Sequence, residues 1–404
     1  MRKTTVITVV SAIAWCAAAA PSIKDGSVEW VQNSANRVTI DYELEGEAAI
    51  VTLDVCTNGV SIGGENIQNL SGDVNRKVAA GRRRIFWSPV KSWPNHRVTD
   101  GSVTMVVSAW SLTNPPDYLV ADLVVSNSLS FYATSNSVPG GVLADRYKED
   151  KLLMRRIPAE NVRFRMGSPS SEEGRQGTLE VPHYVVLTND YYIGVFPVTQ
   201  RQYELLWGGN PSKYQSVENA KWCPVEQARY NYLRSETQMW PGDGHAVASW
   251  SWFGKLRGVT GLDSWDLPTS AEWEYACRAG SGGARYSDAD VSLMAWYSGN
   301  VGGDNAPRPV GQLMPNAWGL YDMLGNRYEW CLDWLAEGAA YSDGSEVTAP
   351  VGPVSGTKRV SRGGCSEDPA SACRCASTYK WGTPTSSTIH QIGFRATCLA
   401  DFRD

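Results

Sequence analysis

The sequence has few histidines, no excess of basic residues and no long apolar run. Only four histidines are scattered through 404 residues and no CxxC pair occurs, so the spacing of an ordinary structural zinc site is missing. Lysine and arginine number 37 against 42 acidic residues, which argues against a nucleic-acid-binding protein. No stretch reaches the roughly 20 apolar residues of a membrane-spanning helix. Hydrolase, metalloprotease and phosphate-loop motifs are absent as well.

The sequence is instead rich in aromatic residues, and its N-terminus is typical of an exported protein. Its 17 Trp and 18 Tyr are too much apolar surface for a disordered chain, and 404 residues predict two folded domains. Met1-Arg2-Lys3, an apolar stretch at 6–14 and an alanine tract predict a secretory signal peptide over residues 1–20. We therefore expect a secreted, periplasmic or cell-surface protein, in a compartment where disulfides persist.

Residues 22–125 show the alternation of apolar and polar side chains that is typical of half-buried strands. Val38, Ile40 and Tyr42 alternate with polar neighbours, and turn signals such as Asn58-Gly59 separate the apolar runs. This pattern predicts a small all-β sandwich of the immunoglobulin or fibronectin type, which we interpret as a spacer or adhesion module.

A stretch rich in Ser, Asn and Gly, residues 126–150, predicts a linker to a second domain over residues 151–404. That domain has many glycines and tryptophans and few helical patterns. Thr269-Ser270-Ala271-Glu272 is a capping box, which predicts the start of a helix. Residues 200–207 and 224–234 are two further helix candidates.

Six short motifs follow one another through the second domain and together indicate a family. In chain order they are RIPA at 156–159 with MGS at 166–168, YI at 192–193 with VTQ at 198–200, LPTSAEWEYA at 267–276, NAWGLYDMLGNRYEW at 316–330, RGG at 362–364 and IGFR at 392–395. The series resembles the formylglycine-generating enzyme (sulfatase-modifying factor) family. The resemblance implies an α+β fold of the C-type-lectin-like kind, poor in regular structure, and it does not by itself fix a function.

The oxidases of this family convert a cysteine of exported sulfatases to formylglycine, using O2 and a copper(I) ion held by two cysteines. Those cysteines lie four and nine residues after the Arg-Gly-Gly motif that ends here at Gly364, and these positions hold Asp368 and Cys373. A hard carboxylate binds Cu(I) poorly, so the pair is incomplete. Cys365, in place of a family serine, would supply a second sulfur only from a rearranged loop. Tyr328 replaces a family tryptophan.

Loss of Cys16 with the signal peptide leaves eight cysteines, an even number that suggests bridges in an exported protein. The resemblance implies one disulfide, between Cys277 and Cys375. Cys331 is a candidate partner for Cys373 because both lie in neighbouring motifs. That pairing would consume the one matching active-site thiol.

The resemblance also implies a calcium site within the motif at 316–330. Its ligands would be the side chains of Asp322 and Glu329 and the backbone carbonyls of Gly325 and Arg327. Carboxylate and carbonyl oxygens suit this hard cation. The alternative is that both carboxylates bond only to loop amides.

Two functions stay open at this point. We favour a scaffold without oxidase activity that binds an extracytoplasmic protein, peptide or glycan, because the copper-binding pair is incomplete. The alternative is a copper-dependent oxidase that acts on exported sulfatases. Some relatives vary between the RGG and IGFR motifs through diversity-generating retroelements, which would make residues 365–391 a variable binding surface. Trp250 and Trp252 belong either to the core or to a cleft for peptide or glycan.

Overall fold

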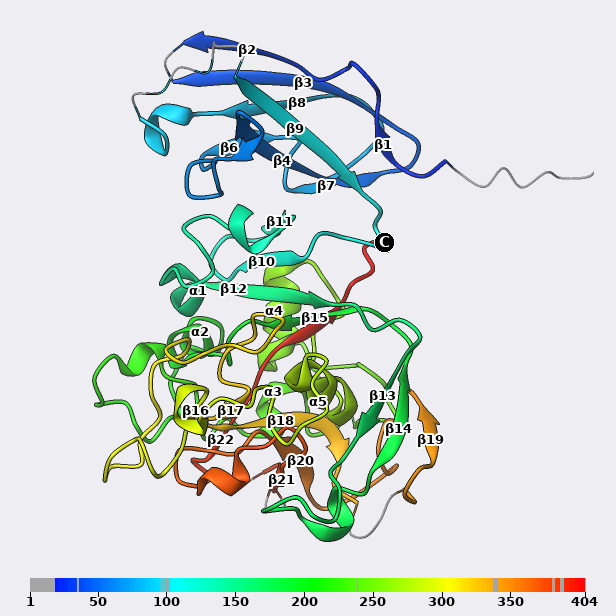
Figure 1. Cartoon of the computed structure of the whole chain (residues 1–404), viewed down its shortest axis with the longest axis vertical. Coiled ribbons are helices and arrows are strands. Elements are labelled where there is room, and N and C mark those ends of the chain that lie inside the picture. Colours follow the sequence, from blue (N-terminus) through cyan, green and yellow to red (C-terminus); the bar gives the residue numbers. More distant parts are fainter. Residues whose placement is uncertain are drawn as a thin grey trace, which may run out of the picture.

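The computed structural model describes residues 19–403, apart from 35, 95, 97, 99–101, 238, 337–340, 380–381 and 386–388. The predicted signal peptide falls almost wholly outside the described residues, and so do residues 386–388 of the predicted variable surface. Figure 1 shows two stacked parts, an all-β part and a larger mixed part. Among the described residues, no helix has the length and apolar character needed to cross a membrane.

The first part consists of two small antiparallel sheets that face each other across one core. One sheet contains β1 (Ser22–Ile23), β2 (Glu29–Ser34), β3 (Arg37–Glu45), β6 (Leu70–Gly72) and β8 (Gly81–Trp87). The other contains β4 (Ala49–Thr57), β5 (Val60–Ser61), β7 (Arg76–Val78) and β9 (Val103–Trp110). This arrangement confirms the predicted all-β region at the N-terminus.

Strand β3 shows the alternation of buried and more exposed side chains that the sequence predicts. Val38, Ile40, Tyr42 and Leu44 are each at most 2% exposed, while their neighbours along the strand are half-buried or exposed. These four side chains pack with Trp87 of β8 in the core between the sheets. Successive strand residues point to opposite faces, so this pattern fixes which face of β3 is buried.

The second part is mixed and poor in regular structure, which confirms the predicted α+β fold. Its largest sheet has the order β11 (Leu129–Tyr132), β10 (Tyr118–Asp122), β12 (Lys151–Ile157), β15 (Tyr191–Gly194) and β23 (Thr397–Leu399). Three smaller sheets complete this part. One contains β13 (Val162–Met166), β14 (His183–Leu187) and β19 (Glu346–Thr348), and another contains β16 (Ala295–Trp296) and β17 (Leu324–Gly325). The third has the order β21 (Thr378–Tyr379), β20 (Arg359–Arg362), β18 (Tyr328–Trp334) and β22 (Ile392–Gly393).

The segment expected as a linker, residues 126–150, contains regular structure instead. It holds β11 and the short helix α1 (Arg146–Glu149), and β11 pairs with β10, which pairs in turn with β12. β10 therefore belongs to the large sheet of the second part, although residues 22–125 were expected to form the first (Figure 1). At the junction, Lys77 Nζ of β7 donates to the Phe402 carbonyl oxygen at 2.9 Å.

The helices of the second part were predicted only in part. Besides α1, its α-helices among the described residues are α2 (Gln200–Trp207), α3 (Tyr230–Leu233), α4 (Trp252–Thr260) and α5 (Ser270–Arg278). The helix predicted at 200–207 is confirmed as α2, and α5 begins at the predicted capping box, with the Thr269 hydroxyl accepting from the Glu272 N–H. The helix predicted at 224–234 is wrong in extent, because only its last third is helical. Helix α4 was not predicted; it buries Trp252 completely and leaves Trp250, just before it, 47% exposed.

Candidate functional site

The Arg-Gly-Gly motif lies at the end of β20, where this strand meets β18. The two strands are antiparallel, and Arg362 lies opposite Glu329. Gly363 and Gly364 follow in left-handed backbone conformations, with φ of 102° and 82°. A Cβ on Gly364 would lie 3.2 Å from the Cys373 sulfur. Glycine is therefore needed here for the chain to turn and for the thiol to approach the backbone so closely.

The two thiols expected in this loop, Cys365 and Cys373, are both completely buried. Burial and, to a smaller extent, the nearby Asp368 carboxylate raise the pKa of Cys373 to about 12. The pKa of Cys365 is also raised, first by burial and then by Asp368. Both groups are therefore protonated thiols at neutral pH, whereas a metal ligand or nucleophile is the thiolate.

Asp368 occupies the centre of this site. Its carboxylate accepts a hydrogen bond from the Cys365 backbone N–H at 3.1 Å. Burial raises the pKa of Tyr328 and of the Cys365 thiol, and the nearby charge of Asp368 raises both pKa values further. The three residues that depart from the family's pattern therefore lie close to one another. We refer to Tyr328, Cys365, Asp368 and Cys373 as the Asp368 cluster.

The chemistry of the Asp368 cluster does not fit a copper(I) site. A soft Cu(I) ion needs sulfur ligands, and the first of the two family cysteine positions holds a carboxylate here. The same carboxylate repels the negative charge that a thiolate at Cys365 or Cys373 would carry. Among the described residues, no group of three or more His, Cys, Asp or Glu side chains is arranged to hold a metal ion.

The cysteines predicted to form the bridge implied by the resemblance lie close to each other. Cys277, on α5, and Cys375 are both buried; burial raises the pKa of the Cys277 thiol, and the nearby Cys375 raises it further. The eight described cysteines are free thiols in the structure, so the bridge itself stays a prediction. The Cys331 thiol contacts the Glu329 carbonyl oxygen at 3.9 Å, and it lies in the same buried core as Cys373. The Cys331–Cys373 pairing stays a prediction.

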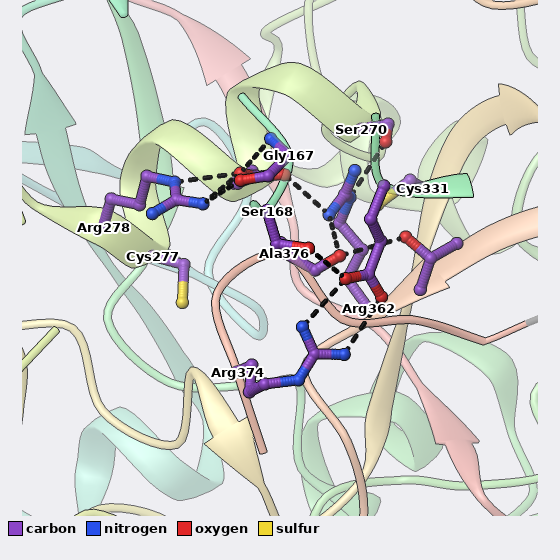
Figure 2. A network of polar contacts seen from close by, with 12 residues as sticks. Gly167, Ser168, Ser270, Cys277, Arg278, Cys331, Arg362, Arg374 and Ala376 are labelled. Atoms are coloured by element: carbon purple, nitrogen blue, oxygen red, sulfur yellow. Dashed lines mark hydrogen bonds and ion pairs between the residues drawn. The ribbon is translucent and has the colours of Figure 1, made fainter. Parts of the chain in front are cut away.

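A network of buried charges, which sequence reasoning missed, involves Arg278 and Arg362 of the Arg-Gly-Gly motif (Figure 2). The Glu274 carboxylate, on α5, accepts from Arg278 at 2.7 Å and from Arg362 at 3.0 Å. It also accepts from the backbone N–H of Gly167 at 2.8 Å. Arg362 in turn donates to the Ser270 hydroxyl at 2.9 Å. The network thus joins three of the family motifs, although only the i,i+4 spacing of Glu274 and Arg278 could have suggested it.

A second buried ion pair holds the segment between Cys373 and Cys375. Arg374 donates to both carboxylate oxygens of Glu180, at 2.8 and 3.1 Å, and to Glu172 at 2.6 Å. Figure 2 shows Arg374 beside Ser168, whose hydroxyl donates to the same Glu180 carboxylate at 2.8 Å. These ion pairs anchor the backbone of the Cys-Arg-Cys sequence at its central residue.

The four residues predicted to bind calcium lie together in and beside β17 and β18. Asp322 accepts from the Gly311 N–H at 2.7 Å and from Asn326 Nδ2 at 3.1 Å. Both oxygens of Glu329 accept from Arg395, the shortest contact being 2.8 Å, and one also accepts from Trp273 Nε1 at 2.7 Å. The oxygens are of the right kind for calcium, but a cation at this place would have to share Glu329 with Arg395.

Comparison with known proteins places this geometry in a family. Residues 148–399 match the family described as "Sulfatase-modifying factor enzyme 1-like domain". The serine/threonine-protein kinase pkn1 of Chlamydia caviae is 28% identical over 280 residues, which are 67% of this chain and 43% of that protein. The formylglycine-generating enzyme of Thermomonospora curvata is 35% identical over 173 residues, which are 39% of this chain and 52% of the enzyme.

The solved structure of Treponema denticola variable protein 1 has the same fold. It aligns with a TM-score of 0.50 at 24% identity and covers 62% of this chain and 95% of that one. The chain spans less than half the length of the Chlamydia relatives. The matched region therefore also occurs within longer proteins that have other names. Because the family match covers more than half of the sequence, this chain belongs to the sulfatase-modifying factor (formylglycine-generating enzyme) family.

Proposed function

We propose that this protein is an exported binding protein whose formylglycine-generating-enzyme-like domain acts as a scaffold without oxidase activity. The observation that supports this proposal is Asp368, which takes the first of the two positions where the family's oxidases have copper-binding cysteines. Its carboxylate accepts a hydrogen bond from the Cys365 backbone N–H, and its charge raises the pKa of the buried Tyr328. A family fold supports many functions, and the residues of the site decide among them.

The cost of forming a thiolate supports the same conclusion. A pKa raised from 9.0 to about 12 makes ionisation of the Cys373 thiol about 4 kcal/mol harder than that of an ordinary cysteine. A bound metal would have to supply this free energy, which already includes the repulsion from Asp368. A second sulfur ligand would strengthen Cu(I) binding, and residue 368 does not provide one.

An aromatic surface between α2 and α4 suits the proposed peptide or glycan ligand. The Trp207 and Tyr232 rings are stacked with centroids 5.3 Å apart, and Trp250 meets Tyr232 at 6.5 Å while 47% exposed. Aromatic side chains are favoured anchors at binding surfaces because they bury large areas with little loss of conformational entropy. We therefore include this surface in the proposed binding role.

Copper binding tests the proposal directly. The purified mature protein is reduced and titrated anaerobically with Cu(I) against a chromogenic Cu(I) chelator. We expect no stoichiometric uptake by the wild type. We expect one equivalent to bind to Asp368→Cys, which restores the family pair, and none to the matched control Asp368→Ser. Uptake of one equivalent by the wild type that is lost in Cys373→Ser would contradict the proposal.

The second candidate function is a copper-dependent oxidase of exported sulfatases. It is favoured by the retention of Cys373 and by relatives named formylglycine-generating enzyme, up to 35% identical. Its test is conversion of a Cys-x-Pro-x-Arg peptide to the aldehyde, followed by mass spectrometry under O2 with added copper. Turnover that Cys373→Ser abolishes would establish this function, whereas the scaffold proposal expects no aldehyde.

A further inference from the structure

A small cavity opens beside the buried charge network, away from the Asp368 cluster. It encloses about 80 Å³ and lies among β14, the first turn of α5, the end of β18 and β20. Most of its walls are apolar, and they include Met166, Leu179, Val181, Leu335, Tyr341 and Val360. Neither Cys365 nor Cys373 is among the described residues that line it. The inference drawn from it is therefore independent of the proposed function.

His183 gives this apolar cavity a directed hydrogen-bond acceptor. Its side chain lines the cavity, and the residue is only 4% exposed. Nδ1 lies 2.8 Å from the Val181 carbonyl oxygen, which can only accept, so the ring proton sits on Nδ1. Nε2 then carries a lone pair, and it has no hydrogen-bond partner among the described residues. The His183 ring stacks on Tyr341 with centroids 4.1 Å apart, which fixes its orientation.

Two other polar groups of the cavity already have partners in the protein. Asp333 is a buried carboxyl that accepts from the Ser270 N–H at 2.6 Å. Arg362 directs its Nε to the Ser270 hydroxyl and its Nη1 to Glu274 and the Ala376 carbonyl oxygen. A buried acceptor without a partner costs about 1–3 kcal/mol, so a molecule that donates a hydrogen bond to His183 recovers this loss.

Charge and size restrict the ligand further. The guanidinium groups of Arg278 and Arg362 are balanced by the carboxylates of Glu274 and Asp333, so an additional charge would be unpaired. The enclosed volume of about 80 Å³ is smaller than the roughly 150 Å³ of an apolar cavity that encloses benzene, so the ligand must be small and part of its ring must extend through the opening to solvent. An aromatic body also suits walls that contain Trp334 and Tyr341.

We propose that this cavity binds a small neutral aromatic molecule that donates one N–H or O–H to His183 Nε2. Ligand sites of this kind are concave and mostly apolar, with a few polar groups that fix the orientation. The donor distinguishes the ligand from a plain hydrocarbon, because only a donor satisfies the lone pair of His183.

The test uses indole and indene, which share their shape but differ in the N–H. Binding to the full mature chain is measured by isothermal titration calorimetry and by saturation-transfer NMR. We expect indole to bind about tenfold more tightly than indene, the effect of one hydrogen bond of about 1.4 kcal/mol. In His183→Phe, which keeps an aromatic ring against Tyr341, the two affinities should become equal.

His183→Phe could lose binding because it folds poorly, so two substitutions of exposed residues test the cavity without changing the core. Thr178 is an exposed residue at the cavity rim, and Thr178→Trp should abolish binding of both probes. Thr113 is exposed in a different loop, and Thr113→Trp should bind like the wild type. Absence of indole binding by the wild type, equal affinity for indole and indene, or binding that survives Thr178→Trp would each overturn the proposal.

Discussion

The carboxylate of Glu274 should contribute a large share of the stability of the second domain. It is fully buried on α5 and bonds to Arg278, Arg362 and the Gly167 N–H. Glu274→Gln keeps the size of the side chain and removes its charge. Two buried guanidinium groups then lose their shared anion, and removal of one partner of a buried ion pair costs about 3–5 kcal/mol.

This loss converts into a thermal shift that is easy to measure. A change of 1 kcal/mol moves the Tm of a domain of 150–250 residues by about 2–4 °C, so Glu274→Gln should lower the Tm by about 6–20 °C. Calorimetry or near-UV circular dichroism of the purified protein at pH 7.5 measures it. The control is Glu204→Gln on the surface of α2, which removes an exposed pair with Arg201 and should shift the Tm by no more than a few degrees. Equal small shifts in both variants would refute the reasoning.

The pH dependence provides a second check on the same residue. Burial alone would raise the pKa of Glu274, but Arg278 and Arg362 hold it below its ordinary value. A carboxyl with a lowered folded pKa stabilises the protein above the ordinary pKa of about 4.3, and the contribution is lost as the pH falls through the folded pKa. The unfolding free energies of wild type and Glu274→Gln should therefore converge below about pH 4. A constant difference down to pH 3 would show that the charge is not responsible.

Three further predictions concern the disulfide, calcium and the cavity carboxyl. In protein purified without reductant, peptide mapping should find Cys277 bridged to Cys375; two alkylated thiols would contradict this. Calcium chloride, compared with EGTA, should raise the Tm of the wild type but not of Asp322→Ala; an unchanged wild-type Tm would indicate that Glu329 pairs with Arg395 alone. Burial raises the pKa of Asp333 to about 6, so its ionisation destabilises the fold as the pH rises from about 4 to 6. Asp333→Asn should therefore exceed the wild type at pH 7.5 by about 2–3 kcal/mol in urea unfolding and match it near pH 4; no gain at pH 7.5 would contradict this.

Local patterns in the sequence predicted the elements that depend on local interactions. The period-two alternation of β3 and the capping box of α5 each involve residues that lie close together in the chain. Helix α4 escaped prediction because Gly254 and Gly258 weaken its helical pattern. The position of β10 in the large sheet depends on its pairing with β12, which lies further along the chain. The strand β11 was missed because it lies in a stretch rich in Ser and Asn.

The candidate site likewise combines features that local sequence reveals with features that depend on distant parts of the chain. The departures at Tyr328, Cys365 and Asp368 could be read against the family's motifs, but their proximity to one another depends on the packed loop. Glu274 and Arg362 are separated by 88 residues, so nothing in their spacing pointed to a shared ion pair. The unpartnered acceptor of His183 likewise exists only because the fold buries it.

The placement of β10 has a practical consequence for work on the second domain alone. The family match begins at residue 148, after β10 and β11. A shortened protein that starts there would leave the backbone groups of β12 unpaired along the edge that faces β10. Exposed strand edges of this kind recruit other chains and promote aggregation. A separately expressed second domain should therefore begin before Tyr118, inside the region that sequence alone would assign to the sandwich.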